Sequence, residues 1–115
     1  MFIHKPVNPK YLKRRKILYG IGVNDADYVT AYISETGTLV ACHFYETWGG
    51  MLERAYSSAF HESSPSYKGC TVSPEWHNFS AFKTWMELQD WEGKALDKDI
   101  LFQGNKEYSP AKCLF

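Results

Sequence analysis

The spacing of apolar residues along the chain changes from a strand-like to a helix-like pattern near residue 47. Before that point, short runs of β-branched and aromatic residues are separated by polar turn residues, which is typical of antiparallel strands. Turns are expected at 24–27, where Asn and Asp cluster, and at 34–37, which contains a glycine. The N-terminal part is therefore predicted to be a short antiparallel β-meander. Its three strands are expected over residues 17–23, 28–33 and 38–45.

Two aromatic-rich helices are predicted in the middle of the chain. Apolar residues from Trp48 to Phe60 recur with the i, i+3, i+4 spacing of one helical face, and Thr47 is expected as the N-cap. Ser73 and Pro74 predict the start of a second helix, because serine caps helices and proline suits the first helical position. Its buried side is expected to carry Trp76, Phe79, Ala81, Phe82, Trp85, Met86 and Leu88. Residues 96–101 are predicted to form a further strand.

Composition places the chain among ordinary single-domain proteins. The 115 residues suffice for one α+β domain, and aromatic residues make up 17% of them, so we expect a core of Trp, Tyr and Phe. No apolar run approaches the length of a membrane span, and the first sixteen residues lack a signal-peptide stretch. Three cysteines, an odd number, argue for a reducing compartment such as the cytoplasm.

A net charge of zero hides a strong asymmetry. Residues 1–16 contain six basic side chains and no acidic one, so residues 17–115 hold seven basic and thirteen acidic side chains, a net charge of −6. We therefore expect a basic N-terminal arm, 1–16, on an acidic domain, 17–115. The arm either contacts phosphates or is a solvated tail that keeps the protein in solution. The phosphate contacts would come from Lys13, Arg14, Arg15 and Lys16.

Two side-chain groups have the chemistry of metal ligands. Cys42, Cys70 and Cys113 lie 28 and 43 residues apart and lack the short spacing of zinc sites, so the pattern favours buried cysteines over zinc. Asp97 and Asp99 would share one face of a strand and could hold Mg²⁺ through their carboxylates. The alternative is that both aspartates simply face solvent.

The first predicted helix carries more acidic than basic charge. Glu46 and Glu53 outnumber Arg54 on its polar positions, whereas a helix offered to a phosphate backbone usually has the opposite balance. These glutamates form either an ordinary solvated face or an acidic surface that docks on a basic protein.

The segment from Phe44 to the end resembles a family of small phage-encoded HNH-endonuclease-like proteins, related to those fused to AP2-type DNA-binding domains. The resemblance rests on an ordered series of matching stretches. These are FYETWGGMLERAYS at 44–57, YKGCTVSPEW at 67–76, Phe79, FKTWM at 82–86 and LDKDILFQGNKEYSPAKCLF at 96–115.

The resemblance implies a ββα-metal core, truncated here, in which a metal and a base generate the hydroxide that attacks a phosphate. It places Asp97 at the metal-binding aspartate and Asn105 at the asparagine that orients the base. Lys98 occupies the position of the histidine base and Lys112 that of the helix asparagine, so the resemblance implies nuclease activity that is weak or lost.

The resemblance and the charge pattern favour two functions, and a third possibility is a structural or assembly protein of a phage. The first is an HNH-like DNA-binding protein in which Arg54 and Lys68 join the basic arm in contacting phosphates. The second is an inhibitor of a host defence nuclease, of the anti-CRISPR or anti-restriction type, whose acidic body, including Glu46 and Glu53, docks on the nuclease's basic groove.

Overall fold

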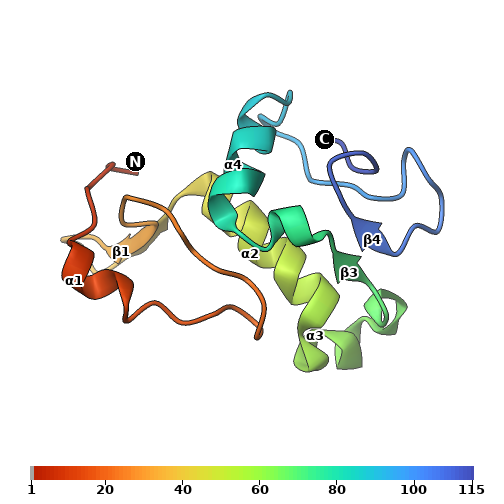
Figure 1. Ribbon diagram of the computed structural model, residues 1–115, viewed down its shortest axis with the longest axis horizontal. Coiled ribbons are helices and arrows are strands. Elements are labelled where there is room, and N and C mark those ends of the chain that lie inside the picture. The colour runs from red at the N-terminus through yellow and green to blue at the C-terminus, as the bar shows by residue number, and fades with distance from the viewer. Residues whose placement is uncertain (1) are drawn as a thin grey trace.

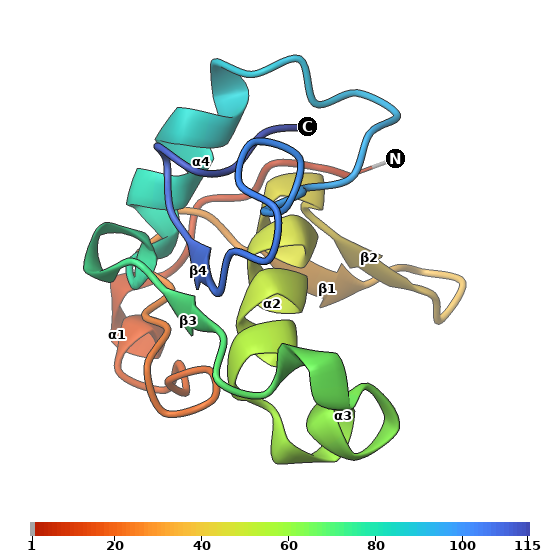
Figure 2. The ribbon, with the colours of Figure 1, turned by 90° about the vertical axis from the view of Figure 1, so that its right-hand side faces the viewer.

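Helix α2 (His43–Tyr56) runs through the middle of the molecule, and α4 (Phe79–Glu87) packs against it (Figure 1). A computed structural model describes residues 2–115 and confirms the α+β class. The N-terminal segment lies on one side of α2, and the C-terminal segment lies on the other. Figure 2 shows α3 (Ser58–Ser63) at the end of α2 and a hairpin that projects from the body.

The hairpin consists of β1 (Ala31–Ile33) and β2 (Leu39–Ala41), paired antiparallel with Tyr32 opposite Val40. Its turn contains the predicted glycine, Gly37, in a left-handed conformation with φ of 80°. Two of the three predicted strands are thus confirmed, although each is shorter than expected.

The predicted strand over 17–23 is wrong, so the three-stranded meander is not formed. Its residues fold back on themselves, and Leu18 and Gly22 form an isolated antiparallel bridge around a turn at Tyr19 and Gly20. The return of the chain brings Gly22 against the core, where an added Cβ would lie 2.4 Å from Leu52 Cδ1.

Helix α2 is confirmed, but it begins four residues before the expected N-cap. Cys42 occupies the N-cap position, and the Thr47 hydroxyl donates to the His43 carbonyl oxygen inside the helix. The predicted continuous helix is broken at Ser57, whose hydroxyl accepts from the Phe60 amide and caps α3. A serine at this point offers the backbone an alternative partner and so favours a new start.

Ser73 and Pro74 begin a single 3₁₀ turn, η2 (Pro74–Trp76), rather than the second helix itself. Helix α4 starts three residues later with Asn78 at its N-cap. Another 3₁₀ turn, η1 (Pro65–Tyr67), lies in the loop that follows α3.

The C-terminal segment differs most from expectation. Residues 96–101 form a turn rather than a strand, and Asp97 makes only an isolated bridge with Leu114. Strand β4 (Glu107–Tyr108) pairs parallel with β3 (Thr71–Val72), and the described residues after β4 contain no helix. The predicted ββα-metal element in this segment is therefore not confirmed.

The core is aromatic, as predicted. Its seven largest fully buried side chains come from α2, η2 and α4: Trp48, Trp76, Phe79, Phe82, Met51, Leu52 and Met86. Trp48 donates from its indole nitrogen to the Trp76 carbonyl oxygen at 2.8 Å, which joins α2 to η2. Two predicted core residues, Ala81 and Leu88, are instead exposed. Among the described residues, no helix has the length and apolar character needed to cross a membrane.

Candidate functional site

The basic N-terminal segment is attached to the body along its backbone. The Val7 amide donates to the Asp27 carbonyl oxygen at 3.1 Å, and the Val29 amide donates to the Lys5 carbonyl oxygen at 2.8 Å. Beyond this pairing, α1 (Pro9–Leu12) begins with a proline and is capped by the Asn8 side chain. These bonds hold residues 5–12 against the chain rather than leaving them free.

Arg15 anchors the segment more firmly than any other basic side chain in it. Its guanidinium donates to the carbonyl oxygens of Asn24 at 2.8 Å, Ala26 at 2.7 Å and Tyr28 at 2.9 Å. The three carbonyl oxygens belong to alternate residues, and one planar guanidinium reaches all of them. Arg15, expected to contact phosphate, is therefore occupied with holding the fold.

The other cations of this segment face solvent. Lys10, Lys13, Arg14 and Lys16 are exposed, and the described residues give none of them a carboxylate partner. Two of them lie near the Tyr11 ring, with Lys10 Nζ 5.1 Å and the Arg14 guanidinium 5.0 Å from its centroid. We call these four cations the basic patch.

The remaining predicted phosphate contacts lie elsewhere. Arg54, on α2, donates to the Tyr108 hydroxyl at 3.0 Å, and Lys68 is exposed just after η1. Figures 1 and 2 place α1 and the turn after α3 on different sides of α2. The structure thus brings together the basic patch but not Arg54 and Lys68 with it.

The two predicted catalytic residues, Asp97 and Asn105, form hydrogen bonds with the nearby backbone. Asp97 Oδ1 accepts from the amides of Asp99 and Ile100 at 2.7 and 2.8 Å, which stabilises a turn. Asn105 donates to the carbonyl oxygens of Lys98 and Glu107 and accepts from the Glu107 amide. These bonds join residues 98 and 107, and they leave the Asn105 amide little hydrogen-bonding capacity with which to orient a base.

Lys98 is nearly buried and holds its charge. Its ammonium pairs with the Asp99 carboxylate at 3.0 Å and lies near the rings of Tyr67 and Tyr108. Burial alone would lower the pKa of Lys98, but the hydrogen bonds and charge of Asp99 outweigh it, and the net pKa is raised. A lysine with a raised pKa is protonated at neutral pH and cannot act as a general base.

The two carboxylates predicted to hold Mg²⁺ make contacts with other groups of the protein. Asp99 faces an ammonium, and Asp97 uses one oxygen on two backbone amides. Residues 2–115 contain no group of three His, Cys, Asp or Glu side chains placed to hold a metal. The three cysteines, weighed above as zinc ligands, are each buried as free thiols.

Glu46 and Glu53 lie two helical turns apart on α2, and both are exposed. Neither has an ion-pair partner among the described residues. Burial of the Tyr19 hydroxyl raises its pKa, and the charge of Glu53 raises it further, which places Glu53 near the 18–22 turn.

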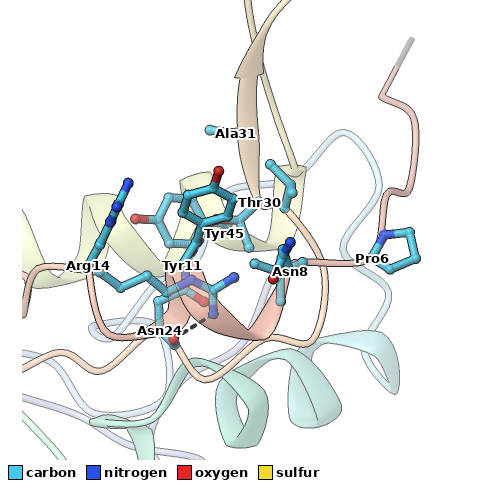
Figure 3. Close-up of a pocket in the computed structure, with 11 residues that line it drawn as sticks. Pro6, Asn8, Tyr11, Arg14, Asn24, Thr30, Ala31 and Tyr45 are labelled. Carbon is cyan, nitrogen blue, oxygen red and sulfur yellow. Dashed lines mark hydrogen bonds between the residues drawn. The ribbon is translucent and has the colours of Figure 1, made fainter.

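A groove of about 570 Å³, unpredicted from the sequence, opens beside the basic patch (Figure 3). It is bordered by the N-terminal segment, the 24–31 chain and the first turn of α2. Its lining combines Pro6, Val7, Asn8, Tyr11, Arg14, Arg15, Asn24, Val29, Thr30, Ala31 and Tyr45. The one available signal was an aromatic residue, Tyr11, set among lysines and arginines.

Comparisons of this chain with protein-family models, with curated proteins and with solved structures found no match. The resemblance to HNH-endonuclease-like proteins therefore rests on the stretches of sequence quoted above.

Proposed function

We propose that this protein binds DNA without cutting it, as an HNH-like module whose nuclease activity is weak or lost. The observation that carries the proposal is the basic patch. Four cations within seven residues face solvent and have no carboxylate partner in the described part of the chain, on a backbone that Arg15 holds in place. A fixed array of cations can contact successive phosphates and release their counterions, which is the main source of sequence-independent DNA affinity.

Weak or absent cleavage follows from the groups that surround the candidate catalytic positions. Lys98 is held in its charged form by Asp99 and so offers no base. The side chains of Asp97 and Asn105 form their hydrogen bonds with the local backbone. The chain therefore retains phosphate contact without a group to activate water.

Fluorescence anisotropy with a labelled DNA tests the proposal. We expect the triple variant Lys13→Gln, Arg14→Gln, Lys16→Gln to bind more weakly and to lower the slope of log affinity against log salt by roughly 2–3. The matched control, Lys94→Gln, Lys106→Gln, Lys112→Gln, removes the same charge from the C-terminal segment, on the other side of α2, and should keep most of the affinity. Equal losses in both triples, or no binding by the native protein at low salt, would contradict the proposal.

A plasmid assay tests the second half of the proposal. Supercoiled DNA incubated with the protein and Mg²⁺ or Mn²⁺ should stay supercoiled, as it does with EDTA. Metal-dependent nicking that Asp97→Ala abolishes would show that the loop rearranges into a working site and would overturn the claim of lost activity.

A second function, docking on a basic protein such as a host defence nuclease, is favoured by Glu46 and Glu53. Both carboxylates are exposed on one face of α2 and have no ion-pair partner within residues 2–115, in a domain of net charge −6. Purified Cas and restriction nucleases provide the test. Inhibition that is lost in Glu46→Lys, Glu53→Lys but kept in the basic-patch triple variant would select this function over DNA binding.

A further inference from the structure

We propose that the groove beside the basic patch holds an unpaired nucleobase, so that the protein prefers single-stranded to duplex DNA. This inference rests on the proposed DNA-binding function and names the form of DNA that is bound. The groove volume, about 570 Å³, lies within the range of roughly 300–1,000 Å³ usual for small organic ligands.

The lining has the chemistry that a nucleotide requires. Pro6, Val7, Val29 and Ala31 contribute apolar wall, which suits the flat face of a base. The charged residues in the lining are both arginines, and none of the described lining residues is acidic. A planar apolar group that carries a negative charge is complementary to such a surface, and a nucleobase joined to its phosphate fits that description.

Tyr11 supplies a stacking surface next to a phosphate contact. Its ring is 43% exposed and borders the groove. The Arg14 guanidinium lies 5.0 Å from the ring centroid and borders the same groove. A base that stacks on Tyr11 would replace Lys10 or Arg14 over the ring, and the displaced cation would then be free to contact the phosphate of that base.

Tyr45 and Asn8 offer polar contacts to the edge of the base. The Tyr45 ring is held edge-on by Phe79, with centroids 5.5 Å apart, and its hydroxyl has no hydrogen-bond partner among the described residues. Burial raises the pKa of Tyr45, so its hydroxyl remains a donor at neutral pH. Asn8 uses its side-chain oxygen on the Lys10 amide, which leaves its NH₂ group for an acceptor on the base.

An unpaired base suits the groove better than a base pair. Bases in a duplex are stacked on their neighbours and occupied by Watson–Crick hydrogen bonds, so a side groove receives one only after it is unpaired. A single strand offers each base without that cost, while its phosphates still reach the basic patch. The groove and the basic patch would then bind the same DNA molecule together only when that DNA is single-stranded.

Anisotropy with one labelled strand, free or annealed to its complement, tests the inference. We expect the single strand to bind about 5- to 150-fold more tightly than the duplex, which is the range for stacking one base. Tyr11→Ala should remove most of this preference, lowering affinity for the strand and leaving the duplex unchanged, and Tyr11→Phe should keep it. Phe102→Ala, which removes an exposed aromatic ring outside the groove, is the matched control.

Cross-linking and competition supply independent readouts. A strand containing 5-iodouracil should cross-link to Tyr11 or Tyr45 under ultraviolet light, and a hundredfold excess of deoxythymidine monophosphate should not displace it. Complete displacement by the mononucleotide would overturn the inference in favour of a nucleotide pocket.

The failure of the inference is distinct from failure of the proposed function. Equal affinity for strand and duplex, with both affinities lost in the basic-patch triple variant, would support the proposed DNA binding. The same result would overturn the proposal that the groove holds an unpaired base. Absence of binding to either form would overturn both.

Discussion

Arg15 donates from Nη2 to the Tyr28 carbonyl oxygen at 2.9 Å, while its other terminal nitrogen serves two more carbonyls earlier in the same stretch. This single side chain fixes the basic segment to the strand-like backbone that leads into the hairpin. It therefore stabilises the surface on which the proposed function depends.

Removing the Arg15 guanidinium and its three hydrogen bonds should destabilise the protein. Hydrogen bonds to a charged group contribute about 1.5–3 kcal/mol, so we expect Arg15→Ala to lower the free energy of unfolding by about 2–3 kcal/mol. Arg15→Lys should recover only part of this, because a lysine lacks the planar fork. Urea unfolding followed by tryptophan fluorescence measures the change. Arg14→Ala is the neighbouring control and should stay within about 0.5 kcal/mol of the native protein.

Gly22 should tolerate no side chain. A Cβ at this position would lie 2.4 Å from Leu52 Cδ1 and 3.1 Å from the Trp48 ring, both in the fully buried core. We expect Gly22→Ala to lower the free energy of unfolding by about 1–3 kcal/mol. Gly49→Ala is the informative comparison, since the added methyl meets only Leu18 at 3.9 Å in mid-helix. That change should stabilise by about 0.5–1 kcal/mol, and a loss in both variants would contradict the packing argument.

The elements that were predictable from the sequence are those whose signals are local. Trp48, Met51, Leu52 and Ala55 repeat with the helical period and are all buried, so α2 was recognised. The hairpin turn was recognised because Gly37 supplies the left-handed residue that it needs. Both signals lie within a few residues of the structure that they specify.

The elements that were missed depend either on a side-chain hydrogen bond that competes with the predicted element or on residues far apart in the sequence. The alternation in residues 96–101 looks like a strand, but Asp97 accepts from two nearby amides and so favours a turn. Arg14 and Arg15 are the same residue type, and only the position of the Asn24–Tyr28 backbone decides which one turns inward. The groove likewise depends on Tyr11 and Tyr45, which the sequence separates by more than thirty residues.

Asp25 caps α4 from a distant part of the chain. Its Oδ1 accepts from the Ser80 amide at 2.7 Å, while Asn78 at the N-cap makes no side-chain bond to the helix. We expect Asp25→Ala to cost about 1 kcal/mol of stability, the usual effect of losing a cap. Asp27→Ala removes an equal charge from an exposed position nearby and should have little effect. Equal unfolding midpoints for the two variants would show that the carboxylate does not stabilise α4.

Asn105 should behave as a structural residue. Its side chain bonds the backbones of Lys98 and Glu107, at 3.1 Å and at 2.6 and 3.0 Å respectively. We expect Asn105→Ala to lower the free energy of unfolding by about 1–3 kcal/mol, because several backbone groups lose their partner together. Affinity for DNA at a temperature where the variant is folded should be unchanged. Reduced affinity with unchanged stability would instead indicate a direct role in binding.

Cys113 should make the protein less stable in alkaline solution. Burial raises the pKa of its thiol to about 11, from an ordinary value of 9.0. Between these values the unfolded chain has lost the proton while the folded chain retains it, so rising pH favours unfolding. The penalty is negligible below pH 9 and grows as the pH approaches 11. The free energy of unfolding should therefore fall by about 1 kcal/mol between pH 8 and 10.

The Cys113→Ala variant isolates this effect. It lacks the titrating thiol, so its stability should fall less steeply over pH 8–10 than that of the native protein, whatever its absolute value. Tyr28 and Tyr108, whose pKa values are also raised, by burial first of all, add their own losses above pH 10 in both proteins. Urea unfolding at pH 8, 9 and 10 gives the two slopes, and parallel curves would mean that the Cys113 thiol ionises as readily in the folded chain as in the unfolded one.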